Sequence, residues 1–323
     1  MEIKIGENPF RPLLDREKVI EDVKNAFSKQ INALEDLVNY GTNLVPRCYG
    51  SSDKGLGAVV VLAILLRQVI AMLDAVEILS SNGAVYAAGL QARALFEASA
   101  YAEWILAADT EKKATYYYVH NLRRQRWWAQ RLKPGSAEAT AFANDVPEIL
   151  TLTNATATMA ATSNLTEIDR ILAQPTLAVV SQVFEQRKLR NGKDVAWHVP
   201  LGPRTVGAVA KSIGRFAEYT FFYALWSEAM HSSNYSHHVR FQKDRVIFQS
   251  IRNLSTFDTL FRQVVATTLR TYRLLLETYR SAELELGAFR RKYLENWQKA
   301  LLEVPKIQYE STPAASRSSP NRA

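Results

Sequence analysis

The stretch AVYAAGLQARALFEASAYAEWILAA, residues 84–108, decides the fold. Its only charged side chains are Arg93, Glu97 and Glu103, and its apolar residues cover every side of a helix with 3.6 residues per turn. Because a helix that is apolar all round is buried, the stretch predicts an interior helix. The apolar stretch 58–79 precedes it, separated by the helix stop signal Ser81-Asn82-Gly83. So short a link predicts that the two helices pack antiparallel, as a hairpin.

Apolar residues at helical spacing predict further helices over residues 15–40, 109–132, 165–173, 176–190, 205–232 and 255–302, the last with a break near Gly287. Residues 136–164 have poor periodicity, and helix and loop both stay open there. Val239-Arg240-Phe241 and Val246-Ile247-Phe248 predict a short β-hairpin. The sequence therefore predicts an all-α fold, a multi-helix bundle with a small β-hairpin insert. We expect one helical domain over 1–304 and a disordered basic C-terminal tail over 305–323, which has few apolar groups.

The composition is typical of a globular protein of the cytoplasm. Cys48 is the only cysteine, so no intrachain disulfide can form, and a reducing compartment is expected. The first residues lack the apolar run of a signal peptide. Stretch 58–79 is the best membrane-spanning candidate, but it carries Arg67, Asp74 and Glu77. Each charge costs about 2.5–3.5 kcal/mol in a membrane, so we expect a globular core helix and no membrane contact.

The few charges of the two apolar stretches need partners, because an unpaired interior charge costs several kcal/mol. Arg93 and Glu97 lie one turn apart, and Arg67 and Asp74, seven residues apart, share a face of the neighbouring helix. An antiparallel hairpin could place Arg67 and Asp74 opposite Glu97 and Arg93, in a charge-compensated interior network.

Two interpretations of these charges stay open. A buried network that fixes the register of the helices is a common structural device. Alternatively, Arg93 and Glu97 form a catalytic site with Ser227 and His231, supported by Arg67 and Asp74. Ser227 and His231 are one turn apart near the end of the predicted helix 205–232, where the helix dipole favours a protonated imidazole.

Three segments carry a resemblance. Arg67–Asp74, Leu90–Glu97 and Tyr223–His231 together resemble a bacterial helical family known only as a domain of unknown function, over about residues 62–231. Its most recognisable parts are the Arg-x-x-x-Glu and Ser-x-x-x-His pairs. The family's members look like parts of bacterial defence or toxin systems, and its helical layout is loosely similar to the HEPN ribonucleases.

The resemblance implies an intracellular helical effector that acts on nucleic acid, with RNA the first choice, in a defence or toxin system. Whether the chain is an enzyme stays open. A metal-independent ribonuclease would need a histidine as general base, His231, and an arginine that stabilises the phosphorane, Arg93. HEPN nucleases place four to six residues between an arginine and a histidine, and this chain lacks that spacing, since seven residues separate Arg190 from His198. The alternative is a non-catalytic helical binding or adaptor protein whose buried charge network is structural.

Residues 111–133 hold seven basic residues and one acid, most of the net charge of +8. The segment could bind a phosphate backbone while a tryptophan stacks on a base. The candidate nucleic-acid-binding residues are Arg123, Arg124, Arg126, Trp127, Trp128 and Arg131. The alternative is a solvated basic face with two core tryptophans.

Other chemistries find little support in the sequence. Glu228, His231, His237 and His238 lack the spacing of a zinc site, and no glycine-rich phosphate loop is present, so we expect neither a metal nor a cofactor. The expected partners are RNA or DNA, and either a second copy of the chain or a partner protein of a defence system.

Overall fold

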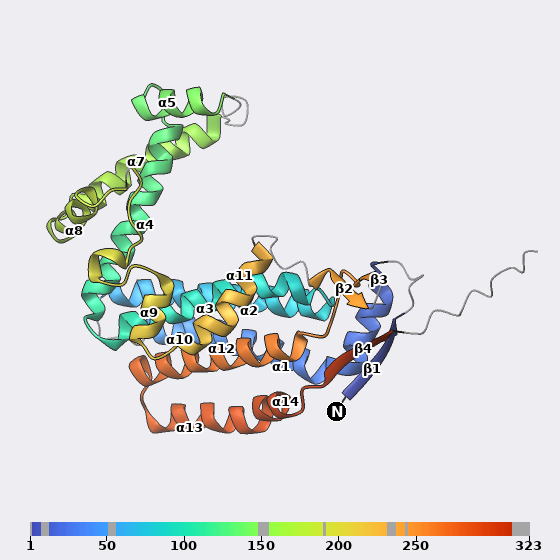
Figure 1. The fold of residues 1–323 in the computed structure, drawn as a ribbon. Helices are drawn as coiled ribbons and strands as arrows, with labels where there is room; N and C mark the ends of the chain where they lie inside the picture. The colour runs from blue at the N-terminus through green and yellow to red at the C-terminus, as the bar shows by residue number, and fades with distance from the viewer. Residues whose placement is uncertain are drawn as a thin grey trace, which may run out of the picture. The chain divides into compact units, whose positions relative to one another are not determined.

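The computed structural model describes residues 2–7, 13–50, 56–147, 155–189, 192–230, 237–242 and 245–311. The fold is an all-α helical bundle with a small β-hairpin insert, as the sequence predicts (Figure 1). The chain divides into two compact units. Unit 1 comprises residues 1–53, 63–103 and 214–323, and unit 2 comprises residues 54–62 and 104–213.

Helices of very different length build unit 1. They are α1 (Arg16–Gly50), most of α2 (Leu56–Ser81) and α3 (Val85–Ala107), α10 (Phe216–Glu218), the π-helix η2 (Tyr219–Tyr223), α11 (Ala224–Met230), α12 (Phe257–Tyr279), α13 (Glu283–Lys292), the π-helix η4 (Tyr293–Trp297) and α14 (Gln298–Leu302). Its strands are β1 (Glu2–Glu7), β2 (Val239–Gln242), β3 (Arg245–Phe248) and β4 (Lys306–Ser311). Unit 2 contains α4 (Thr110–Leu132), α5 (Ala137–Asp145), α7 (Ala155–Leu172), α8 (Pro175–Glu185), the 3₁₀ turn η1 (Val199–Leu201) and α9 (Val206–Ser212).

Helices α2 and α3 form the predicted antiparallel hairpin. Gly83 adopts a positive φ of 74°, its N–H donates to the Ser80 carbonyl, and the Ala84 N–H donates to Leu79. The ends of the two helices next to Gly83 belong to unit 1, and their far ends belong to unit 2. Every residue of α3 from 85 to 106 is buried or half-buried, which confirms the prediction of an interior helix.

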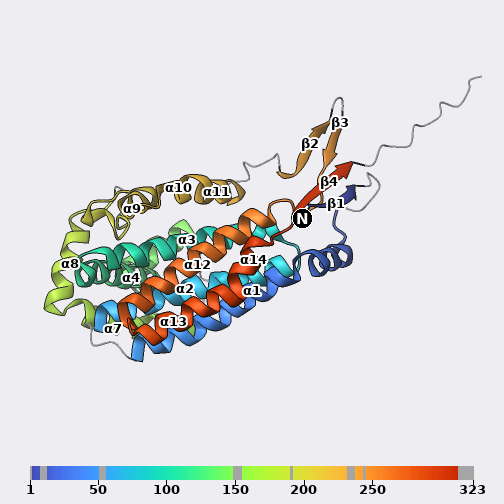
Figure 2. The same cartoon turned by 90° about the horizontal axis from the view of Figure 1, so that it is seen from below.

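The core of unit 1 joins α1 to α12 and to the C-terminal helices. Tyr272 of α12 is fully buried, its hydroxyl donates to the Leu37 carbonyl at 2.9 Å, and its ring lies 5.7 Å from Tyr40. Burial raises the pKa of the Tyr272 phenol far above its ordinary value. Gly41 of α1 faces the same hydroxyl so closely that a Cβ atom would overlap it. Figure 2 shows α1, α12 and α13 running along the bundle together.

Aromatic packing also organises unit 2. Trp197 is buried, with its ring centroid 5.2 Å from those of both Trp104 and Tyr117. Lys113 of α4 donates to the Trp104 carbonyl at 2.6 Å, and its ammonium lies 4.5 Å from the centre of that indole. Burial lowers the pKa of Lys113. The lysine therefore ties the start of α4 to the end of α3.

The strands give the fold its non-helical parts. β2 and β3 pair antiparallel and confirm the predicted hairpin, with Val239 opposite Phe248 and Phe241 opposite Val246. β1 and β4 pair in parallel, a ladder that the sequence did not predict. β4 takes up the first residues of the segment predicted as tail, and residues 312–323 lie outside the described chain.

Two helix boundaries correct the sequence predictions. The predicted helix 205–232 is interrupted, because α9 ends at Ser212 and Gly214 has a φ of 72° that ordinary side chains disfavour. The predicted break near Gly287 is wrong, since Gly287 lies inside α13 and the chain breaks at Ala282, in an extended conformation before that helix. An isolated glycine can lie within a helix at a cost of about 1 kcal/mol, so Gly287 does not by itself end the helix.

Among the described helices, the segment Gly57–Ser81 of α2 is long and apolar enough to cross a membrane. Of the 18 most apolar consecutive residues of this segment, 50% are buried inside the protein. The other half includes an exposed stripe with a helical period, formed by Ile64, Arg67, Ala71, Asp74 and Ile78.

Candidate functional site

Arg93 and Glu97 of α3 come together with Tyr223, the last residue of the π-helix η2. The Arg93 guanidinium donates to the Tyr223 hydroxyl at 2.9 Å, and this hydroxyl donates to a carboxylate oxygen of Glu97 at 3.2 Å. The guanidinium carbon also lies 4.6 Å from the centre of the tyrosine ring. These three residues, which we call the Arg93 centre, all belong to unit 1. The sequence predicted the two α3 residues but missed Tyr223.

Burial keeps the Tyr223 phenol protonated. Arg93 and Glu97 are half-buried, and Tyr223 is buried. The pKa of Tyr223 is raised above its ordinary value, first by desolvation and then by the Glu97 charge, against the opposing effect of Arg93. At neutral pH the phenol is therefore a hydrogen-bond donor that holds Glu97 and an acceptor that holds Arg93.

Of the two other predicted catalytic residues, the structure describes Ser227. Ser227 lies one turn beyond Tyr223, but its hydroxyl donates to the Tyr223 carbonyl at 2.6 Å, a bond within its own helical turn. His231 lies outside the described residues. The Arg-x-x-x-Glu pair is thus tied through Tyr223 to the helical segment that carries Ser227.

The predicted supporting network of Arg67 and Asp74 is wrong. Both side chains lie on the exposed stripe of α2 and face solvent, whereas Arg93 and Glu97 are half-buried. The reason is visible in their spacing. Residues seven apart share one face of a helix, and here that face is the exposed one.

A different arginine, Arg215, makes the buried ionic network of unit 1. Its side chain has 0% exposure and donates to Glu218 at 2.7 Å, to the Ser99 hydroxyl at 2.8 Å and to Glu103 at 3.4 Å. Glu103 also accepts two bonds from Arg270, at 2.9 and 2.5 Å. Two arginines and two glutamates thus compensate one another in the Arg215 network. It fastens the start of the α10–η2–α11 segment to α3, and this segment carries Tyr223.

A histidine lies further along the same face of α3. Tyr86 is seven residues before Arg93, and the two share a face. The Tyr86 ring stacks on His237 with centroids 4.0 Å apart, and His238 approaches it edge-on at 5.5 Å. Burial lowers the pKa of His237, so its neutral form is favoured in the folded protein. Among the described residues no group of three His, Cys, Asp or Glu side chains could hold a metal.

The basic segment of α4, in unit 2, is partly neutralised. Arg123 forms a bidentate pair with Asp194, at 2.7 and 2.9 Å, and binds Glu185 at 2.8 Å. Arg126 pairs with Asp169 at 2.6 Å. These two predicted nucleic-acid-binding residues therefore serve contacts within unit 2, and their charge is largely cancelled locally.

Trp127 and Trp128 differ in how accessible their rings are to a ligand. The Arg131 guanidinium stacks on Trp127, with its central carbon 3.2 Å from the ring centre. Trp128 is 48% exposed, and its ring lies 4.7 Å from Trp127 and perpendicular to it. Arg124, one turn before Trp128, is exposed. Trp128 and Arg124 are therefore the part of the predicted set that a strand of nucleic acid can reach.

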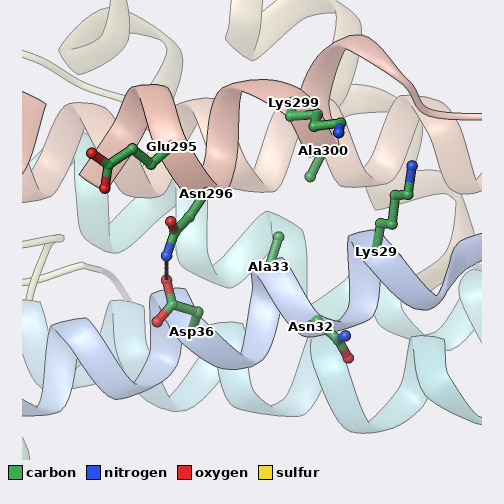
Figure 3. A pocket seen from close by; sticks show the side chains of 8 residues that line it. All are labelled: Lys29, Asn32, Ala33, Asp36, Glu295, Asn296, Lys299 and Ala300. Carbon is green, nitrogen blue, oxygen red and sulfur yellow. Dashed lines mark hydrogen bonds between the residues drawn. The ribbon is translucent and has the colours of Figure 1, made fainter. Parts of the chain in front are cut away.

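An open pocket of about 390 Å³ lies between α1 and the η4–α14 segment, and Figure 3 shows the side chains around it. It is lined by Lys29, Asn32, Ala33, Asp36, Glu295, Asn296, Lys299 and Ala300. Asp36 accepts hydrogen bonds from Lys292 and Trp297, both at 2.8 Å, and Lys29 pairs with Glu303 at 2.8 Å. These bonds join α1 to the C-terminal helices. None of the predicted site residues lines the pocket.

Comparison with known proteins places the Arg93 centre within a recognised sequence family. Residues 59–246, more than half of the chain, match the model of a family described only as being of unknown function. The match includes Arg93, Glu97, Arg215 and Tyr223, and it excludes α1 and α12. No curated protein and no solved structure matches the chain.

Proposed function

The chain belongs to that family, DUF5677, and we propose that it is an intracellular helical effector that acts on RNA in a bacterial defence or toxin system. The observation that carries the proposal is the Arg93 centre, where a guanidinium, a phenol and a carboxylate are hydrogen-bonded in series. RNA is the substrate that the resemblance to helical defence families, set out in the sequence analysis, implies. The single cysteine, Cys48, fits a reducing cytoplasm.

The charge distribution supports a polyanionic partner. Unit 2 carries fifteen Lys and Arg residues against nine Asp and Glu residues, which is six of the net eight positive charges of the chain. A basic surface of this kind attracts a phosphate backbone.

The proposed reaction is metal-independent cleavage by the 2′-hydroxyl of RNA. The His231 imidazole, as general base, takes the proton of the 2′-hydroxyl as the 2′-oxygen forms a bond to the adjacent phosphorus. Arg93 stabilises the phosphorane charge, and the bond from phosphorus to the 5′-oxygen breaks. The imidazolium formed at His231 returns this proton to the leaving 5′-oxygen, and Glu97 holds Arg93 in place through Tyr223. The products are a 2′,3′-cyclic phosphate and a 5′-hydroxyl.

We expect the purified chain to cleave total RNA in the presence of EDTA and to leave these two ends, read by end-specific labelling. Arg93→Ala, Glu97→Gln and His231→Ala should each slow cleavage by about 100-fold or more, since they remove the charge at the phosphorane, the group that positions that charge and the proton carrier. The control is Arg67→Ala, an exposed arginine of the neighbouring helix, which should cleave at the wild-type rate. An Arg93→Ala variant with full activity, or a wild-type chain that leaves every RNA intact, contradicts the proposal.

Binding should depend on Trp128. Stacking on one aromatic ring contributes about 1–3 kcal/mol per base, so Trp128→Ala should weaken binding of a single-stranded RNA by about 5- to 100-fold, measured by fluorescence anisotropy. Arg124→Ala should reduce the slope of log affinity against log salt by about 1. Met159→Ala, at a 74% exposed apolar position of unit 2, is the control and should bind as wild type does. Unchanged affinity in the Trp128 variant would mean that the bases do not stack there.

A non-catalytic helical adaptor is the second candidate, and the Arg215 network favours it. The most buried charge of unit 1 is fully engaged by protein groups, as in a network that only fixes helix positions. If the chain is an adaptor, Arg93→Ala lowers the stability of the fold, and no variant changes the extent of RNA cleavage.

A further inference from the structure

The β2–β3 hairpin has one apolar face. Residues opposite each other in an antiparallel pair point to the same side of the ribbon, as do residues two apart along a strand. The pairs Val239–Phe248 and Phe241–Val246 therefore place four apolar side chains on a single face. Figure 2 shows the two strands extending away from the helices of unit 1.

This face is largely exposed. Phe241 is 66% exposed, Val246 is 54% exposed and Phe248 is 67% exposed. Ile251, 59% exposed, follows the hairpin and donates its N–H to the carbonyl of Leu13, itself 49% exposed. A two-stranded ribbon is only marginally stable by itself, and a clustered apolar patch marks an interaction surface.

The arrangement of large and small side chains on the face is self-complementary. The two phenylalanines occupy one diagonal of the four positions, and the two valines occupy the other. A twofold axis lying between two such faces, parallel or perpendicular to the strands, puts each phenylalanine opposite a valine of the other copy. Large residues then fill the spaces over small ones, as in a well-packed core.

We propose that this hairpin face is a homodimer interface, in which the apolar face of one copy packs on the same face of a second copy. Isologous contacts of this kind are the commonest in soluble oligomers. Since a phenylalanine can bury roughly 150–250 Å², the exposed side chains offer on the order of 400 Å² per copy. An interface of ordinary size buries about 800 Å² per partner, so the face would form its apolar centre, with a polar rim from neighbouring residues. The inference is independent of any activity on RNA.

The test is the molar mass of the full chain in solution, measured by light scattering and sedimentation equilibrium across a concentration series. The wild type should dimerise, and Phe248→Asp should raise the dimer Kd at least about 100-fold, because the change puts a charge in the centre of the interface. Leu284→Asp, at an 88% exposed position of α13, is the matched control and should dimerise as wild type does. Far-ultraviolet circular dichroism and thermal unfolding verify that each variant is folded.

A second variant distinguishes specific packing from non-specific hydrophobic association. Val246→Phe enlarges the apolar area but places a ring opposite another ring, so it should weaken the dimer although the surface becomes more hydrophobic. Stronger association of Val246→Phe overturns the proposal, as does a wild type that stays monomeric throughout. Flotation of a monomeric wild type with anionic phospholipid vesicles, lost in Phe248→Asp, would overturn it in favour of a membrane surface.

Discussion

Replacing Arg215 with Met is expected to lower the free energy of unfolding by about 3–5 kcal/mol, because it leaves Glu218 near the interior without its counter-charge and removes one of the two arginines that hold Glu103. The arginine side chain has 0% exposure, and its partners Glu103 and Glu218 are 16% and 33% exposed. Urea unfolding followed by circular dichroism measures the loss. Arg270→Met removes the 46% exposed partner of the same Glu103 and should cost only about 1 kcal/mol or less.

A double variant sharpens this prediction. Adding Glu218→Leu to Arg215→Met removes the carboxylate that lost its arginine, so the double variant should recover part of the lost stability. If the Arg215 variant loses no more stability than the Arg270 variant, the Arg215 network does not hold the α10–η2–α11 segment in place.

Gly89→Ala is expected to destabilise the protein by about 2 kcal/mol, although alanine is the better helix former. The exchange gains about 1 kcal/mol of helix propensity. It also puts a methyl group into the indole of Trp226, with ring atoms Cδ2 and Cζ3 only 2.6 Å from the new Cβ. Trp226 is 3% exposed and its indole N–H donates to Gln263 at 2.8 Å. Displacing the ring would therefore cost both packing and this hydrogen bond. Overpacking then outweighs the propensity gain.

Gly287→Ala is the matched control, because its neighbourhood is open. Only the Arg291 guanidinium lies within 4 Å of the new Cβ, at 3.8 Å. The propensity gain is then unopposed, and we expect up to about 1 kcal/mol of added stability. Calorimetric unfolding of the two variants should therefore give shifts of opposite sign. Shifts of the same sign would show that α3 does not press on Trp226 as described.

The central hairpin could be predicted because local and global signals agree there. Ser81-Asn82-Gly83 supplies the turn, Gly83 takes the positive φ that suits glycine, and the apolar flanks are long enough to be unambiguous. The β2–β3 hairpin was found by its alternation of apolar residues in the same way. The β1–β4 ladder could not be predicted, because its strands lie about 300 residues apart and pairing at that distance has no local signature.

Only part of the candidate site could be predicted from the sequence. The position of Arg93 and Glu97 in an apolar helix singles them out, but their partner Tyr223 comes from a segment far along the chain, and aromatic residues are common there. Arg215 gave one signal that could have been used, since it follows Gly214 in the middle of the predicted helix 205–232 and thus begins a new element. Glu103, the third charge of α3, proved to be its partner.

The prediction that Arg67 and Asp74 belong to an interior network was wrong because it relied on the average hydrophobicity of stretch 58–79. Stretch 58–79 is so apolar that burial on every side seemed required, yet its charged residues fall on one stripe with Ile64, Ala71 and Ile78. A helix in a bundle buries one side, and the stripe that carries the charges is the one that stays in water.

The ladder between β1 and β4 constrains how the protein is made on the ribosome. Residues 2–7 are synthesised about 300 residues before their pairing partners, residues 306–311. The early strand therefore keeps an open edge while the residues between the two strands are translated, and open edges invite pairing with other chains. A nascent chain halted before residue 306 would expose that edge, so premature termination should yield aggregates even when the helices have already folded.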